Sequence, residues 1–221
     1  MNSPQIIILL GRSGSGKGTQ AKLLQEKLSL EYVGSGDLLR SRKKIQDFTG
    51  KKMGEVIDRG EFVSSVVIFK LWLDKWEEIK NAGEFKGFVI DGSPRKLIEA
   101  HLMDQALEWY GWDKYLKIIL IDLSREEAFG RLSKRKICKD CGKVIPYIGE
   151  FKNLKTCDKC GGELIIREDD APEGINSRQD EFERETNPVI DYYEKGGRII
   201  KVNGDQSIED VHKDIMAALG K

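Results

Sequence analysis

Short runs of apolar residues alternate with helix-patterned segments along most of this chain. The first run, Ile6–Leu10, is continuous and ends at Gly11, as expected for a strand buried on both faces of a parallel sheet. A segment with apolar residues at helical spacing begins at Gly16. Similar apolar runs return at Phe88–Ile90, Ile118–Leu123 and Ile199–Val202. This alternation predicts an α/β fold built on a doubly wound parallel sheet.

Two stretches interrupt the alternation and read as insertions between sheet strands. The stretch from Gly34 to about Leu71 is polar and mostly helical in pattern, and the stretch from Lys136 to Arg167 is rich in glycine. We therefore expect one core domain with two insertions, divided as 1–33, 72–133 and 171–221 for the core, 34–71 for a helical insertion and 134–170 for the second insertion.

Length and charge limit the classes of partner. A chain of 221 residues supports one substantial hydrophobic core. Its 37 basic and 37 acidic residues give zero formal charge, so no global attraction to nucleic acid or to an anionic membrane is expected. No apolar run reaches the roughly 18 residues that a membrane span needs. We expect a cytoplasmic protein, a monomer by default, that binds anionic ligands locally.

A glycine-rich loop lies between the first predicted strand and the first predicted helix. Its sequence, Gly-Arg-Ser-Gly-Ser-Gly-Lys-Gly-Thr, occupies residues 11–19. Glycines let successive backbone N–H groups turn toward phosphate oxygens, and the helix N-terminus adds a partial positive charge. Lys17 adds a full charge, although Gly18 stands where the strict phosphate-loop pattern has Ser or Thr. The loop predicts a phosphate site; a turn that only caps the helix is the alternative.

The cysteines form one local cluster of two Cys-x-x-Cys pairs. Each pair is followed by glycine, and the four residues are Cys138, Cys141, Cys157 and Cys160. Four thiolates at this spacing predict a closed tetrahedral site for structural zinc, which would hold together an insertion too small to bury a core. A redox disulfide pair and an iron site remain the alternatives.

The run Gly-Lys-Gly-Thr-Gln at residues 16–20 resembles the phosphate loop of adenylate kinases. Three further motifs resemble the family in the same order along nearly the whole chain: Ser-Gly-Asp-Leu-Leu-Arg at 35–40, Asp-Gly-Ser-Pro-Arg at 91–95, and Arg-Glu-Asp-Asp at 167–170 followed by Arg178. The resemblance implies a P-loop NTPase type of core, a helical monophosphate-binding insertion and a zinc-binding lid. It also implies Mg²⁺-dependent, reversible transfer of a phosphoryl group from ATP to AMP, giving two ADP.

The resemblance also implies roles for individual residues. Phosphoryl transfer needs charged substrates held in line, shielded from water, with the growing negative charge offset, and arginine suits that task. Asp91 would hold Mg²⁺ through water, and Asp169 and Asp170 would steady the lid or its arginines. The catalytic set is Lys17, Asp91, Arg95, Arg131, Arg167, Asp169, Asp170 and Arg178.

The same resemblance assigns two nucleotide sites, over which the two insertions are expected to close by hinge motions. The expected ATP site comprises Gly14, Ser15, Gly16, Lys17, Gly18, Thr19, Arg131, Arg135, Val144, Ile145 and Gln206. The expected AMP site comprises Ser35, Arg40, Glu61, Phe62, Val63, Gly92, Ser93, Pro94, Arg95, Glu99, Arg167 and Arg178.

Three positions depart from the usual pattern of the family. Ser13 replaces a common proline in the loop, Ser93 replaces an aromatic residue, and Glu99 stands where glutamine commonly reads adenine. A carboxylate can accept from the two adjacent donors of guanine but cannot donate to adenine. Glu99 therefore raises the alternative of a kinase with broadened or GMP-shifted acceptor specificity, while the rest of the chain favours AMP.

A different class of function is an ATP-gated binding protein whose zinc knuckle contacts RNA or another partner. Such a switch needs no second nucleotide pocket, whereas a kinase needs arginines at both sites, as this chain has. The second insertion contains several lysines but also interspersed acids, and ATP itself accounts for a basic surface there. The sequence therefore favours the enzyme.

Overall fold

The structure is a computed structural model that describes residues 3–59, 61–167 and 170–221. Its centre is a sheet of five strands in the order β2-β3-β1-β4-β8, and every pairing in it is parallel. The strands are β1 (Gln5–Leu10), β2 (Glu31–Gly34), β3 (Gly87–Asp91), β4 (Leu116–Asp122) and β8 (Ile199–Asn203). The sequence predicts four of them and misses β2, because its residues Glu-Tyr-Val-Gly form no apolar run and its first side chain is exposed.

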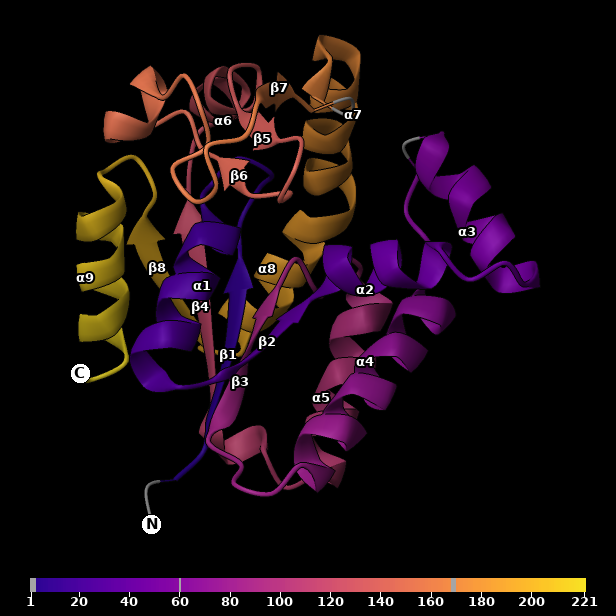
Figure 1. The fold of residues 1–221 in the computed structure, drawn as a ribbon. Helices are drawn as coiled ribbons and strands as arrows, with labels where there is room; N and C mark the ends of the chain where they lie inside the picture. The colour runs from indigo at the N-terminus through magenta and orange to yellow at the C-terminus, as the bar shows by residue number, and fades with distance from the viewer. Residues whose placement is uncertain (1–2, 60, 168–169) are drawn as a thin grey trace.

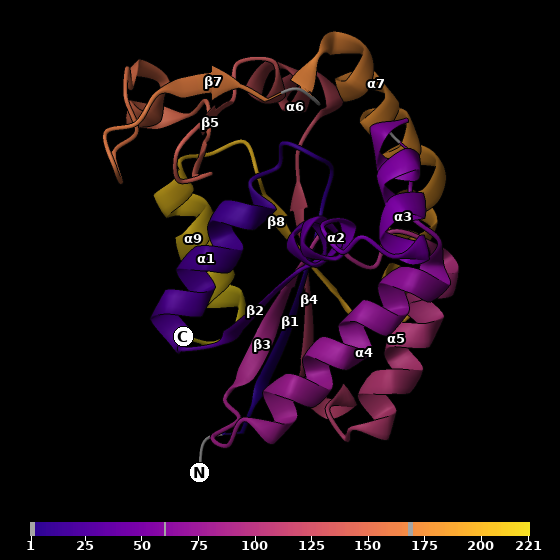
Figure 2. The ribbon, with the colours of Figure 1, turned by 45° about the vertical axis from the view of Figure 1, so that its right-hand side comes forward.

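Helices cover both faces of the sheet, as a doubly wound fold requires (Figure 1 and Figure 2). On one face lie α1 (Lys17–Leu28) and α9 (Ile208–Ala218), and their buried side chains share a cluster with Ile7 and Leu9 of β1. On the other face lie α4 (Ser65–Asn81), α5 (Leu97–Trp109) and α8 (Asn187–Lys195). The fold class expected from the sequence is thus confirmed.

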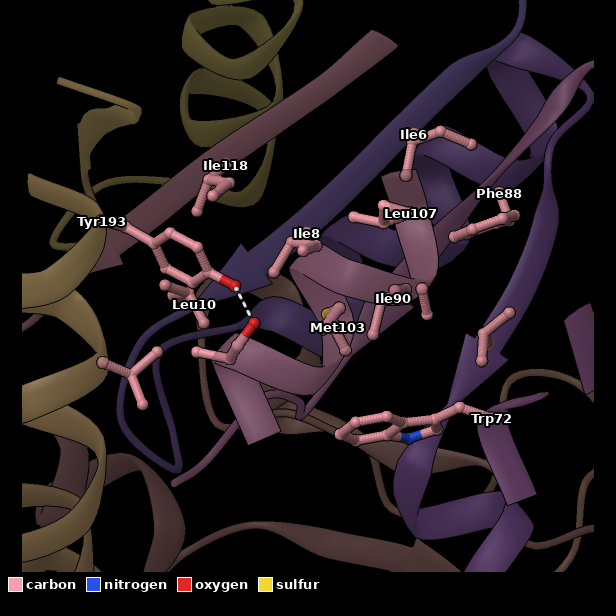
Figure 3. Packing of buried hydrophobic residues seen from close by; sticks show 14 of the residues in the cluster. Ile6, Ile8, Leu10, Trp72, Phe88, Ile90, Met103, Leu107, Ile118 and Tyr193 are labelled. Carbon is pink, nitrogen blue, oxygen red and sulfur yellow. Dashed lines mark hydrogen bonds between the residues drawn. The ribbon is translucent and has the colours of Figure 1, made fainter. Parts of the chain in front are cut away.

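Strand β1 is apolar throughout Ile6–Leu10 because both of its faces are buried. Successive side chains of a strand point to opposite faces, so Ile6, Ile8 and Leu10 join the α4, α5 and α8 side while Ile7 and Leu9 join the other. Ile6 through Leu9 are 0% exposed. Figure 3 shows Ile6, Ile8 and Leu10 packed among side chains of the first cluster. This rigid strand leads directly into the glycine-rich loop.

The helical insertion contains α2 (Ser35–Lys43) and α3 (Phe48–Asp58), and α3 extends away from the sheet (Figure 1 and Figure 2). Asp47 caps α3 by accepting a hydrogen bond from the Gly50 backbone N–H at 2.8 Å. The predicted boundary between residues 71 and 72 lies inside α4, whose Ile68 and Trp72 both belong to the core cluster. The division into core and insertions remains a prediction.

The second insertion, which we call the lid, follows α6 (Arg125–Leu132). It holds a small antiparallel sheet in the order β6-β5-β7, made of β5 (Lys136–Cys138), β6 (Val144–Ile145) and β7 (Leu164–Ile166). Short 3-10 turns are Asp113–Tyr115 before β4 and Gly149–Asn153 in the lid. The chain leaves the lid through α7 (Pro172–Glu181) and a π-helical segment, Phe182–Thr186, that leads into α8. Figure 1 shows the lid beyond the carboxyl end of the central sheet.

Candidate active site

The glycine-rich loop connects the carboxyl end of β1 to α1, which begins at Lys17. Gly11, Gly14 and Gly16 have φ values of 140°, 92° and 95°, a region that side chains with a Cβ disfavour. A Cβ on Gly11 would also lie 2.5 Å from the Ile121 carbonyl oxygen of β4. The buried Ser15 Oγ has no hydrogen-bond partner among the described residues, which suits a loop that awaits a ligand.

Lys17 folds back onto this loop. Its Nζ donates to the carbonyl oxygens of Gly11 at 2.6 Å and Arg12 at 2.9 Å. Burial lowers the pKa of Lys17 to about 8; the Asp91 carboxylate opposes this shift, and Arg95 and Arg135 add to it. An anion bound at the loop would restore the pKa, because it stabilises the charged ammonium.

Asp91, at the carboxyl end of β3, lies against the start of α1. A Cβ on Gly18 would lie only 3.1 Å from Asp91 Oδ2, so glycine at this position leaves room for the carboxylate. Glycine at this departure from the strict loop pattern therefore avoids a tight contact with the carboxylate. Tyr32 of β2 donates its hydroxyl to Asp91 Oδ2 at 3.1 Å, and burial beside this carboxylate raises the pKa of Tyr32. Nothing in the pattern around Tyr32 indicated this contact.

Arg95 is partly buried near the loop, and desolvation lowers the pKa of its guanidinium. Its Nε donates to the Gly92 carbonyl at 2.8 Å, and the centre of the Phe62 ring lies 5.0 Å from its guanidinium carbon. Thr186 of the π-helical segment donates to the Arg95 carbonyl at 3.1 Å. The segment between α7 and α8 thus fixes the backbone of Arg95, a role that the sequence did not indicate.

Both carboxylate oxygens of Glu99 accept hydrogen bonds from groups of the protein itself. One carboxylate oxygen accepts from the backbone N–H of Arg95 at 2.8 Å, which closes the N-terminus of α5, and the other accepts from the Ser65 hydroxyl at 3.1 Å. Glu99 is 4% exposed. The carboxylate therefore ties the start of α5 to the start of α4.

Ser93, which stands where the family commonly has an aromatic residue, forms a buried hydrogen bond with Ser35. Their hydroxyl oxygens lie 2.5 Å apart, and the Trp72 indole N–H donates to Ser35 Oγ at 3.2 Å. Both serines are 2% exposed. Trp72 of α4 thus extends this buried contact through its indole N–H.

Asp170 binds two arginines, one that precedes the lid strands and one on α7, which follows the lid. It accepts two hydrogen bonds of 2.7 Å from Arg135 and one of 2.6 Å from Arg178 on α7. Its side chain is 0% exposed, so the pairs lie largely out of water, where charge pairing is strong. Asp169, expected beside it, lies outside the described residues.

A small cavity brings together the side chains on which the phosphate-site prediction depends. It has a volume of about 50 Å³, and its lining includes Lys17, Arg95, Arg178, Phe62 and Phe182. A larger groove of about 640 Å³ lies between α5, α8 and the amino ends of β4 and β8. The smaller cavity is the candidate site, because it alone of the two contains the glycine-rich loop and converging cations.

Other predicted site residues lie outside the lining of this cavity. Arg131 donates to the Gly204 carbonyl at 3.0 Å, Arg40 pairs with Asp37 at 2.5 Å, and Gln206 donates to the Asn203 carbonyl at 2.9 Å. Of the others, Thr19 lies in α1, Val144 and Ile145 form β6, Glu61 and Val63 lie in the loop before α4, and Arg167 lies at the lid exit. Their predicted contacts with nucleotide remain predictions.

The four cysteines meet in the lid. Their sulfur atoms all lie within 4.8 Å of one another. In each pair the following glycine has a positive φ, 69° at Gly142 and 75° at Gly161, and its N–H donates to the first cysteine's carbonyl. These turns point four thiols at one centre, a donor set that suits a tetrahedral metal ion.

Membrane insertion by a helix finds no support in the part of the chain that the structure describes, since none of its helices combines the needed length and apolar character.

Comparisons with known proteins agree with this geometry. A family model described as adenylate kinase matches residues 9–198. The adenylate kinase of Caldicellulosiruptor bescii is 37% identical over 217 residues, covering 97% of this chain and 98% of the relative. Those of Archaeoglobus fulgidus and Thermodesulfovibrio yellowstonii are each 38% identical over 216 residues, covering 97% of this chain and 98% and 99% of the relative. This chain therefore belongs to the adenylate kinase family and is a phosphotransferase that acts on nucleoside monophosphates.

Proposed function

We propose that the protein catalyses reversible transfer of a phosphoryl group from ATP to AMP, with Mg²⁺, to give two ADP. The observation that carries the proposal is the cavity lined by Lys17, Arg95 and Arg178, at the end of a glycine-rich loop. One cation comes from the loop, one from the segment after β3 and one from α7. Such convergence suits a donor phosphate and an acceptor phosphate that must meet in line.

The donor side of the proposed site is the loop and the lid. Loop amides and Lys17 would hold the β- and γ-phosphates, while Arg135 and Arg178 would leave part of their contact with Asp170 to bind phosphate oxygens. Asp91 would hold Mg²⁺ through water, and that ion would offset charge on the phosphates. The acceptor side is Arg95, with Phe62 against its guanidinium.

Closure of both insertions over the nucleotides is part of this proposal, because water in an open site would take the phosphoryl group. The cavity of about 50 Å³ is too small for a nucleotide, so the elements around it must move apart to admit one. We also propose that the cysteine cluster holds structural zinc, with no open coordination position for chemistry.

AMP is the proposed acceptor, and Glu99 is the residue whose replacement tests this choice. To accept two hydrogen bonds from guanine, the Glu99 carboxylate would have to give up its donors, the Ser65 hydroxyl and the Arg95 backbone N–H. We expect AMP to be the preferred acceptor of the wild type and of Glu99→Gln. A coupled assay for ADP formation with AMP, GMP, CMP and UMP measures this. A GMP preference in the wild type that Glu99→Gln reverses to AMP would assign Glu99 to guanine recognition instead.

The same assay tests the proposed function as a whole. Wild-type protein with Mg²⁺ and ATP should form ADP rapidly with at least AMP, and formation should stop without a monophosphate. No consumption of ATP with any of the four acceptors would overturn the proposal.

Binding of ATP should be coupled to proton uptake through Lys17. With a pKa of about 8, roughly half of the ligand-free protein carries a neutral Lys17 at pH 8, and phosphate favours the charged form. We expect uptake of about half a proton per ATP at pH 8, measured by titration calorimetry in buffers of different ionisation enthalpy. Lys17→Arg, which stays charged, should lose this uptake; equal uptake in both proteins would contradict the assignment.

The same pKa predicts how stability depends on pH in the ligand-free protein. The folded pKa of about 8 lies below the ordinary value of 10.5, so the unfolded chain binds more protons between these values. The contribution of Lys17 to the free energy of unfolding should therefore increase as pH rises from about 8 to 10.5. Urea unfolding across this range measures it against Lys17→Met, which lacks the titrating group; the same pH dependence in both proteins would refute the shift.

A further inference from the structure

We propose that Gln179 is a positioning residue that fixes the phosphate loop against α7, so that Lys17 and Arg178 face each other at the distance that transfer requires. This inference rests on the proposed phosphoryl transfer. Gln179 belongs to none of the sequence motifs that resemble the family, and it is not among the residues expected to contact nucleotide. Its role follows from where the fold places its side chain.

The side-chain amide of Gln179 contacts the phosphate loop through both of its ends. Its Nε2 donates to the Ser13 carbonyl at 3.1 Å, and its Oε1 accepts from Arg12 Nη1 at 2.9 Å. Gln179 is 0% exposed. A buried amide is costly unless its donor and acceptor are both satisfied, and here the loop satisfies both. The contact therefore holds only while loop and helix keep one relative position.

Arg12 extends the contact along the helix. The same Nη1 lies 3.3 Å from Glu183 Oε1, and the guanidinium carbon lies 4.8 Å from the centre of the Phe182 ring. Arg125 of α6 pairs with Glu183 at 3.1 Å and with Asp180 at 2.6 Å. The loop, α6, α7 and the π-helical segment are thus joined through charged and polar side chains around one buried amide.

The position of this contact connects it to the chemistry. Arg178 precedes Gln179 on α7 and lines the small cavity, as do Ser13 and Lys17 from the loop. Gln179 therefore binds the loop, while the neighbouring Arg178 places its side chain at the small cavity that the loop also lines. Since a displacement of about 1 Å between reacting groups can cost about a hundredfold in rate, a loosened loop should slow transfer.

Ser13 gives a reason for this restraint. The family commonly has proline there, whose ring fixes φ, whereas serine leaves the backbone freer. In this chain the hydrogen bond from Gln179 to the Ser13 carbonyl restrains the same residue from outside. A restraint within the loop is replaced by one between the loop and α7.

The test compares Gln179→Leu with the wild type in the coupled assay, at a fixed interval of about 20 °C below the melting temperature of each protein. Leucine has similar size and removes both hydrogen bonds. We expect kcat to fall about ten- to a hundredfold, with KM for AMP within about twofold of wild type. A kcat within about twofold of the wild type would overturn the inference, whereas an inactive wild type would instead overturn the proposed function.

Two further variants keep the test decisive. Tyr193→Phe removes a buried hydroxyl that donates to the Ala100 carbonyl, at 3.5 Å, away from the loop (Figure 3). This control removes a buried side-chain hydroxyl outside the loop and should keep kcat unchanged; an equal fall in both variants would mean general destabilisation and would overturn the inference. If Gln179→Leu fails to fold, Gln179→Glu serves in its place, because a carboxylate still accepts from Arg12 but cannot donate to Ser13, and the same fall in kcat is expected.

Discussion

Replacing Lys17 by methionine should lower kcat/KM for ATP about a thousandfold, the upper end of the effect of removing one preorganised donor from developing charge. In the structure the partly buried Lys17 donates to two loop carbonyls and lines the same small cavity as Arg95 and Arg178. Methionine keeps most of the length of the side chain but supplies neither charge nor donors. Initial rates at varied ATP and fixed AMP measure the effect.

Lys22→Met on the same helix is the matched control. Its side chain is exposed on α1 and does not line the small cavity, so its replacement should leave kcat/KM unchanged. If Lys17→Met retained about a tenth or more of the wild-type kcat/KM, the assignment of the loop as the donor site would be wrong.

Loss of the zinc proposed for the lid should have the second largest effect. Among the described residues 136–167, the buried ones are Cys138, Ile145 and Cys157, too few to stabilise a sheet of three short strands without a further link. The proposed structural zinc would supply that link, since the free energy of metal binding is also folding free energy. Cys157→Ser should therefore lose zinc, lose hydrogen-exchange protection in the lid strands, and slow turnover about a hundredfold, because Arg135 would no longer be held in place.

Lys139→Gln provides the comparison for this experiment. It changes an exposed lid residue, which pairs with Glu163, and keeps all four cysteines. It should bind one zinc ion per chain by elemental analysis and keep the activity of the wild type. A wild-type protein that is isolated free of zinc, fully active and with a protected lid would contradict the proposed site.

The sheet was predictable from the chain where strands are buried on both faces. Ile6–Leu10 and Ile118–Leu123 are apolar almost throughout because helices cover both sides, and such runs are visible without a structure. Strand β2 was not, since its pairing with β3 depends on a partner more than fifty residues away rather than on its own four side chains.

The candidate site likewise has a part that the sequence predicts and a part that it does not. The glycine-rich loop and the cysteine pairs are local patterns whose spacing follows from the geometry of phosphate and metal binding. Contacts such as Tyr32 with Asp91, Thr186 with the Arg95 carbonyl, and Gln179 with the loop join residues that are far apart in the chain. They arise from the packing of α7, the π-helical segment and β2 against the core, which no short pattern encodes.

The strand order has a consequence for biosynthesis. Strand β1 is the first to leave the ribosome, yet in the sheet it lies between β3 and β4, with Gln5 opposite Gly87 and Ile6 opposite Leu116. Its isoleucines and leucines must therefore remain unpaired while more than eighty further residues are translated. Throughout that interval the apolar side chains of β1 lack their neighbouring strands, and an exposed apolar strand of this kind is an aggregation hazard for the nascent chain.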